Sequence, residues 1–283
     1  MQTCNLDLSC LAGVFLTSLV ILAGGLAGRA FGVEIVAHRG ASYSAPENTL
    51  ASVRLAWQRN AGAVEIDIYL TADGRIVALH DSTTKRTAGK DWKVADHTLA
   101  ELKTLDAGVW KGAAWAGEEI PTLEEILATI PDGKRLFIEV KCGPKILPEF
   151  ERVLKTCGKQ PAQTVVISFD LATVRAVKAK MPLLPVYWIR PTSPRRDKKT
   201  GQIVDRLDDL IETCQKSGLD GLDLAQDSQL TKELIERIHG LGLEMHVWTV
   251  NSPDDARRLV ALGVDGITTD RPGWLREQLQ TGE

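Results

Sequence analysis

Cysteine is scarce in this sequence, which has five cysteines in 283 residues. They form no CxxC pair and none has zinc-like spacing, so the sequence gives no sign of a cysteine metal site. Three of them, Cys142, Cys157 and Cys214, lie beyond the N-terminal segment. We expect these three to be buried or partly buried thiols.

The sequence also has no excess of positive charge. The chain has 34 Lys and Arg against 37 Asp and Glu, with a formal net charge of -3 and no long basic run. Nucleic-acid binding is not expected, because its usual electrostatic footprint is a basic stripe. An anionic ligand must therefore be held by local cations. With 44% hydrophobic residues the chain can bury a sizeable core, and its length suits one large barrel or two smaller domains.

One long apolar stretch without charge, residues 11–26, stands near the N-terminus and is followed by small residues. We predict that residues 1–32 are a secretory signal peptide, cleaved after Ala30 or Gly32. The alternatives are an uncleaved membrane anchor, although the stretch is short for one, and a misassigned start codon. Either export outcome places the body in the periplasm or outside the cell, with membrane association if the leader stays attached.

Short β-rich runs alternate with helical segments over residues 33–283. The runs predicted as strands are residues 34–37, 64–68, 136–140, 165–169, 185–189, 221–224, 245–250 and 266–268. This alternation predicts a parallel sheet, and eight such units in one domain favour a closed barrel. The predicted fold is therefore a single α/β domain, a (β/α)8 TIM barrel. A further run, residues 76–79, is predicted to form a hairpin with the second strand, before a long connection.

Carboxylates recur on two of the predicted strands. Glu65 and Asp67 are two residues apart, so they leave the same face of one strand, and Glu139 and Lys141 repeat the pattern. Catalytic groups of such barrels gather at the carboxyl ends of the strands. Charges there are costly unless paired or bound to a cation, and three carboxylates suit a hard divalent ion. The alternative is a set of ion pairs, such as Glu139 with Lys141 or Arg39.

Two of the five histidines, His38 and His80, directly follow apolar strands. A pair at neighbouring strand ends, above a carboxylate cluster, fits a general acid and a general base near neutral pH. Asp81 either orients one of them or is an exposed turn residue. We assign no chemical role to the other three histidines.

Two cations, Arg39 and Lys141, stand beside these groups. Arginine binds two phosphate oxygens through its fork, and lysine acts as a point charge, so both suit a phosphoryl group. Asn48 or Thr49 is expected to cap the helix that follows, with backbone N–H groups near the barrel mouth.

Eight motifs along the body resemble those of glycerophosphodiester phosphodiesterases. They are HRG (38–40), PENT (46–49), EIDIYLTADGRIVALHD (65–81), IPTLEEIL (120–127), IEVK (138–141), SF (168–169), WTVN (248–251) and GVDGITTDRP (263–272). The resemblance implies a (β/α)8 barrel with one divalent metal ion, usually calcium or magnesium. Residues 83–115 follow the family pattern only loosely, so the sequence does not indicate the leaving group.

The resemblance also implies roles for eight residues. The matching positions are Glu65, Asp67 and Glu139 for the metal, His38 and His80 for acid–base catalysis, Arg39 and Lys141 for the phosphate, and Trp248 for the pocket wall. The expected reaction is hydrolysis of a glycerophosphodiester to glycerol 3-phosphate and an alcohol, with His38 favoured as base and His80 as acid. The alternatives are a phospholipase, with Trp92, Trp110 and Trp115 available near the mouth, and a non-catalytic phosphate-binding protein.

Overall fold

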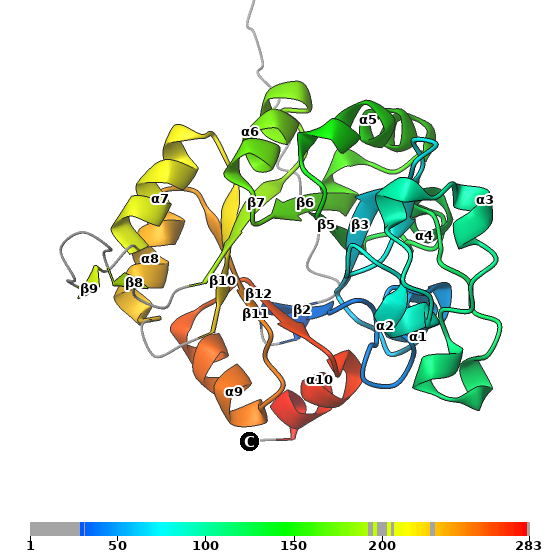
Figure 1. Cartoon of the computed structure of the whole chain (residues 1–283). Helices are drawn as coiled ribbons and strands as arrows, with labels where there is room; N and C mark the ends of the chain where they lie inside the picture. Colours follow the sequence, from blue (N-terminus) through cyan, green and yellow to red (C-terminus); the bar gives the residue numbers. More distant parts are fainter. Residues whose placement is uncertain are drawn as a thin grey trace, which may run out of the picture.

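Eight parallel strands form a closed barrel with helices around it in the computed structural model (Figure 1). The model describes residues 29–30, 32–191, 195–196, 203–204, 207–226 and 230–281. In spatial order the barrel strands are β2 (Val33–Ala37), β3 (Ala63–Leu70), β5 (Arg135–Val140), β6 (Thr164–Ser168), β7 (Val186–Arg190), β10 (Gly221–Ala225), β11 (Glu244–Trp248) and β12 (Gly266–Thr269). Pairing of β12 with β2 closes the ring. The predicted (β/α)8 barrel is confirmed, and each predicted strand is present.

Helices follow the strands and cover the outside of the barrel (Figure 1). The longer ones are α1 (Leu50–Gln58), α5 (Leu147–Thr156), α6 (Leu171–Lys180), α7 (Leu207–Lys216), α8 (Lys232–Gly240), α9 (Pro253–Leu262) and α10 (Pro272–Gln280), with the shorter α4 (Leu123–Leu127) between β4 and β5. Capping residues in the sequence mark where several of these helices begin. Ser252, for example, accepts a hydrogen bond from the backbone of Asp255, with Pro253 in the first turn of α9.

The strand β4 (Ile76–Ala78) pairs antiparallel with β3, which confirms the predicted hairpin. The connection after it contains two short α-helices, α2 (Lys85–Ala88) and α3 (Leu99–Leu102). It also has its own buried apolar cluster, formed by Val77, Leu79, Val94, Leu102, Leu105, Ala107 and Ile120. The connection is therefore a folded layer beside the barrel mouth.

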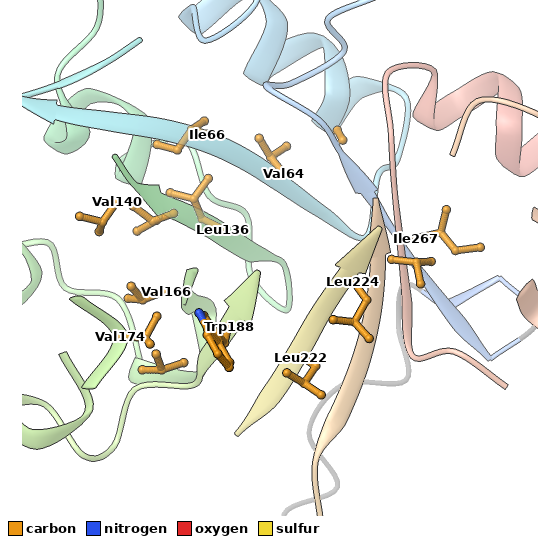
Figure 2. Close-up of a cluster of buried hydrophobic side chains, with 14 of the residues drawn as sticks. Val64, Ile66, Leu136, Val140, Val166, Val174, Trp188, Leu222, Leu224 and Ile267 are labelled. Atoms are coloured by element: carbon orange, nitrogen blue, oxygen red, sulfur yellow. The ribbon is translucent and has the colours of Figure 1, made fainter. Parts of the chain in front are cut away.

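Apolar side chains of the strands fill the layer between barrel and helices, as Figure 2 shows for Val64, Ile66, Leu222 and Leu224. Each fully buried side chain of this size contributes about 1.5–3 kcal/mol. Because neighbouring residues of a strand point to opposite faces, Glu65 lies between Val64 and Ile66 but faces the barrel interior. The packing of the outer layer therefore fixes which side chains point inward.

The amino-terminal end of the barrel is filled by a polar group that we call the bottom cluster: Glu34, Arg135, Tyr187, Glu244 and His246. Arg135 Nε lies 3.1 Å from both carboxylate oxygens of Glu34. The Tyr187 hydroxyl donates to Glu244 Oε2 at 2.8 Å, and His246 Nε2 lies 3.2 Å from the same oxygen. Apolar residues above it separate this cluster from the carboxyl ends of the strands. This end of the barrel is closed.

The predicted leader, residues 1–32, lies outside the described residues except for residues 29–30 and 32. No helix in the described ranges is long and apolar enough to cross a bilayer. Three cysteines are described, and all are free thiols. Cys214 is buried, whereas Cys142 and Cys157 are half-buried, as expected.

Candidate active site

Three carboxylates converge at the carboxyl ends of β3 and β5. Asp67 on β3 stands directly beside Glu139 on β5 in the strand register, and Glu65 is one pleat repeat below. One carboxylate oxygen from each lies within 4.8 Å of the others, and all three side chains are buried. The donor set suits a hard divalent cation such as calcium or magnesium. Glu139 thus faces the interior of the barrel, as metal ligation requires.

Two cations partly neutralise this cluster. Lys141 Nζ lies 2.9 Å from Glu139 Oε1 and 3.3 Å from Asp67 Oδ1. Arg39 Nε lies 3.3 Å from Asp67 Oδ2, whereas its backbone N–H donates to Glu65 Oε2 at 2.9 Å. The ion pair between Glu139 and Lys141 that was the alternative to metal binding is therefore present. Three carboxyl groups outnumber the two cations beside them, so the two interpretations are compatible.

The pKa values reflect this excess of carboxylates. Burial, and then the charges of Asp67 and Glu139, raise the pKa of Glu65 well above its ordinary value. Burial and the Asp67 carboxylate raise the pKa of Glu139 to about 7. Burial also opposes ionisation of Asp67, but Lys141 and Arg39 outweigh it and lower the Asp67 pKa. Protons and a divalent cation therefore compete for these carboxylates.

The turn before α1 positions these groups. Thr49 caps the helix, since its hydroxyl accepts from the Ser52 backbone N–H at 3.3 Å. Asn48 does not cap the helix. It adopts a positive φ of 57° and clamps Asp67, donating to Oδ2 at 2.9 Å and accepting from the Asp67 N–H at 3.0 Å. Gly40 is required nearby, because a Cβ there would come within 2.5 Å of Ser52. Asn48 is thus a positioning residue that the capping pattern did not indicate.

His38 follows β2 and is oriented by a carboxylate from the last strand. Its Nδ1 lies 2.7 Å from Asp270 Oδ1. Asp270 also accepts from the Ser42 hydroxyl at 3.1 Å and from the Asn251 amide at 2.6 Å. Burial opposes its ionisation, but the hydrogen bond from His38 leads the contacts that lower the Asp270 pKa to about 2. Asp270 was not among the predicted site residues, although it directly follows β12.

His80 follows β4 and has a carboxylate partner of its own. Its Nδ1 lies 2.7 Å from Asp81 Oδ1, and Asp81 Oδ2 accepts from Arg86 Nε at 2.7 Å. The hydrogen bond from Arg86 is the main cause that lowers the Asp81 pKa to about 2. Of the two predictions for Asp81, the geometry supports the orienting role.

Arg86 connects the two halves of the site through Glu47. Its two terminal nitrogens donate to the Glu47 oxygens, each at 2.8 Å. Glu47 also accepts from Arg39 Nη1 at 3.1 Å, and Arg39 reaches Asp67. An ion-pair chain therefore runs from the partner of His80 to the carboxylate cluster. Neither Glu47 nor Arg86 was assigned a role from the sequence.

A pocket of about 150 Å³ opens between these groups. Seven of the eight predicted site residues line it, namely His38, Arg39, Glu65, His80, Glu139, Lys141 and Trp248. The eighth, Asp67, is buried behind them. The opposite wall is mainly apolar, and the Trp248 ring packs edge-on against Phe169 with ring centroids 5.5 Å apart. Seven of the predicted residues therefore share one cavity.

A closed (β/α)8 barrel whose mouth carries three convergent carboxylates and two oriented histidines has the parts of an acid–base hydrolase for an anionic ester. Residues 38–274 match the model of the glycerophosphoryl diester phosphodiesterase family, and the chain belongs to this family. It is therefore an enzyme, a phosphoric diester hydrolase.

Individual relatives agree with this assignment. A glycerophosphodiester phosphodiesterase of Caldanaerobacter subterraneus is 33% identical over 254 residues, which cover 88% of this chain and 98% of the relative. One of Bacillus subtilis is 33% identical over 255 residues, covering 84% and 83%. The structure of an Oleispira antarctica phosphodiesterase in complex with the product sn-glycerol-3-phosphate is 30% identical. It has a TM-score of 0.77 and covers 88% of this chain and 97% of that chain.

The ion-pair chain leads to a prediction for Arg86. Replacing Arg86 with Met should lower kcat/KM about 10–100-fold, the usual effect of losing a group that orients metal ligands and their partners. Arg86→Lys should restore activity only in part, because lysine lacks the fork that holds two carboxylates at once. Lys85→Met is the matched control, since Lys85 only pairs with the exposed Asp91 at 3.0 Å. Equal activity of Arg86→Met and the control would contradict the prediction.

Proposed function

We propose that the protein hydrolyses glycerophosphodiesters to sn-glycerol 3-phosphate and an alcohol, with one calcium or magnesium ion bound by Glu65, Asp67 and Glu139. The convergence of these three buried carboxylates between two oriented histidines is the observation that carries the proposal. Membership of the family supports it, as does the product bound to the Oleispira antarctica relative. When bound, the ion would neutralise a phosphate oxygen and orient the nucleophile.

The cations of the site hold the phosphoryl group in this proposal. Arg39 and Lys141 both line the pocket and are themselves fixed by carboxylates. Their charges face the pocket in which negative charge builds up during attack on phosphorus. Because they are positioned before substrate binds, they need little reorganisation during the reaction.

The histidines move the protons. Each presents Nδ1 to a carboxylate, Asp270 for His38 and Asp81 for His80, which leaves Nε2 to act in the pocket. We assign His38 as the base that takes the proton of the nucleophile, and His80 as the acid that protonates the leaving alkoxide. Asp81 and Arg86 keep the His80 ring oriented for this transfer.

An exposed apolar rim favours one alternative, a phospholipase that acts on lipid or lysolipid. Tyr43, Val109 and Trp110 are 58%, 52% and 39% exposed. Their segments lie together, because Lys111 Nζ donates to the Ser42 carbonyl at 2.7 Å. Trp92 does not join this rim, since it packs in the connection.

Comparing soluble and lipid substrates tests the proposal. With calcium or magnesium present, we expect release of sn-glycerol 3-phosphate from glycerophosphocholine and glycerophosphoethanolamine, and slower turnover of lysophosphatidylcholine. Faster cleavage of the lysolipid would support the phospholipase instead. Binding of sn-glycerol 3-phosphate without turnover of any diester would indicate the non-catalytic alternative.

We also propose that residues 33–283 are the catalytic unit and that residues 1–32 direct its export to the periplasm or the exterior. The uncharged apolar stretch of the leader supports this. Fractionation of the native host tests it, and full-length protein in the cytosol with Met1 intact would contradict it.

A further inference from the structure

A buried carboxyl group of the active-site pocket has an oxygen that makes no hydrogen bond. Asp223 lies on β10 between Leu222 and Leu224, which pack into the outer layer, so its side chain points into the barrel. It lines the pocket and is only 4% exposed. Its Oδ1 makes no hydrogen bond, and no ion pair to Asp223 is found in the described part of the chain. His246, its neighbour in the strand register, is instead hydrogen-bonded to Glu244.

This environment is unlike that of the other acidic groups in the pocket. Glu139 has Lys141 beside it and Glu65 accepts from the Arg39 backbone N–H, whereas burial raises the pKa of Asp223 to about 7 with His246 opposing it. A buried carboxyl that lacks hydrogen bonds destabilises the fold. Because Asp223 does not stabilise the fold, its position in the pocket points to a role in binding a ligand.

The position of Asp223 indicates which part of a ligand it meets. In the ring of eight strands, β10 is four strands from β3 in either direction. Asp223 therefore stands across the barrel from Glu65 and Asp67. A phosphodiester bound at the carboxylate cluster by its phosphate would direct one of its two substituents towards Asp223, past Trp248 and Ile189 on the flanking strands.

The chemistry of the pocket favours a hydroxyl-bearing substituent. A carboxyl group accepts hydrogen bonds from hydroxyl groups, and in its protonated form it also donates one. With a divalent ion at the three carboxylates, the ion, Arg39 and Lys141 would together outweigh their negative charge and disfavour an ammonium group in a pocket of about 150 Å³. A quaternary ammonium also has no hydrogen to donate. The glycerol end of the substrate carries free hydroxyls and is small enough to reach a residue this deeply buried.

We propose that Asp223 is a specificity-determining residue, which binds the free hydroxyl groups of the glycerol moiety while the phosphate is held at the carboxylate cluster. This inference rests on the proposed function. It assigns the glycerol to the side of the pocket formed by β7, β10 and β11, and the variable alcohol to the open side.

Binding of two phosphate monoesters tests the proposal in the presence of calcium. sn-Glycerol 3-phosphate has two free hydroxyls, and n-propyl phosphate has none. By titration calorimetry, the wild type should prefer sn-glycerol 3-phosphate about 10–100-fold, the range for hydrogen bonds to a charged group. Asp223→Leu should abolish the preference without weakening propyl phosphate binding. Asp223→Asn, which keeps one acceptor oxygen, should retain part of it.

Equal affinity of the wild type for the two monoesters, or an unchanged preference in Asp223→Leu, would overturn the proposal. A loss for both monoesters alike would also overturn it, since the residue would then support only the shape of the pocket. Turnover of the diesters is measured separately. Hydrolysis without the hydroxyl preference contradicts the role of Asp223 alone, whereas the preference without hydrolysis contradicts only the proposed function.

Discussion

Removal of divalent metal should abolish hydrolysis of glycerophosphodiesters, and calcium or magnesium should restore it. Without a cation, burial and the neighbouring carboxylates raise the pKa of Glu65 well above its ordinary value and that of Glu139 to about 7, which disfavours the fully ionised cluster. Arg39 and Lys141 are then the positive charges left beside the pocket for the phosphoryl group. The measurement is the release of sn-glycerol 3-phosphate after chelation and after reloading with each ion. Full activity after exhaustive chelation would contradict the metal assignment.

Glu65→Gln separates metal binding from folding. Glutamine keeps an oxygen for the Arg39 backbone N–H but removes a buried carboxyl group whose ionisation is opposed by burial and by Asp67. We expect this variant to lose metal-dependent activity and to unfold, without metal at pH 8, at the same or a higher temperature than the wild type. Asp91→Asn, at an exposed position, is the control and should change neither property. A folded Glu65→Gln variant with full activity would remove Glu65 from the ligand set.

The same site should bind metal more weakly in acid. The pKa of Glu139 is raised to about 7, so below that pH a proton must leave before the oxygen can bind the ion. For one displaced proton, the metal concentration that gives half-maximal activity should rise about tenfold per pH unit below 7. Glu139→Gln should show a weaker dependence in direct metal titrations, because only Glu65 of the three ligands then keeps a raised pKa. A wild-type affinity that stays constant between pH 5 and 8 would contradict it.

Replacing either His38 or His80 with Ala should lower kcat about 10²–10⁴-fold, the usual contribution of a general acid or base. Both variants should fold, because each ring is partly exposed, with 21% and 31% of its side-chain surface accessible. His239→Gln is the control, since His239 pairs with Asp265 away from the pocket. Small and equal losses in both variants would remove the proposed roles.

The leaving group distinguishes the two histidines. A nitrophenolate leaves without protonation, so a nitrophenyl ester of glycerol phosphate should recover most of the activity in the variant that lacks the acid. We expect this recovery for His80→Ala and not for His38→Ala. Recovery in His38→Ala alone would reverse the assignment of acid and base while keeping the pair.

The carboxylate cluster was predictable because it follows from local rules. Glu65 and Asp67 share a face by strand periodicity, and barrel strands bring their carboxyl ends together. The same rule at the end of β12 would have indicated Asp270. By contrast, the contact of Arg86 with Glu47 joins residues 39 positions apart through two loops. No periodicity links such residues, and only the folded connection brings them together.

The short helices α2 and α3 of the connection were also not predicted from the sequence. A helix of four residues, such as α2 or α3, is unstable alone. The free-energy cost of nucleating the helix exceeds the stabilisation from its one or two hydrogen bonds. These helices form because their apolar residues pack into a separate cluster over β4. The sequence of α2 carries little sign of this, whereas Thr98 and Glu101 form a capping box that marks the start of α3.

The bottom cluster has a kinetic consequence. Since Arg135 and its partners fill the amino-terminal end of the barrel, we expect substrate to enter and both products to leave at the carboxyl end. In the proposed binding mode, with the glycerol at Asp223 and its phosphate at the carboxylates, the alcohol would lie nearer that end and would leave first. The phosphate product would then have to leave before the next substrate binds, so we expect its accumulation to slow turnover.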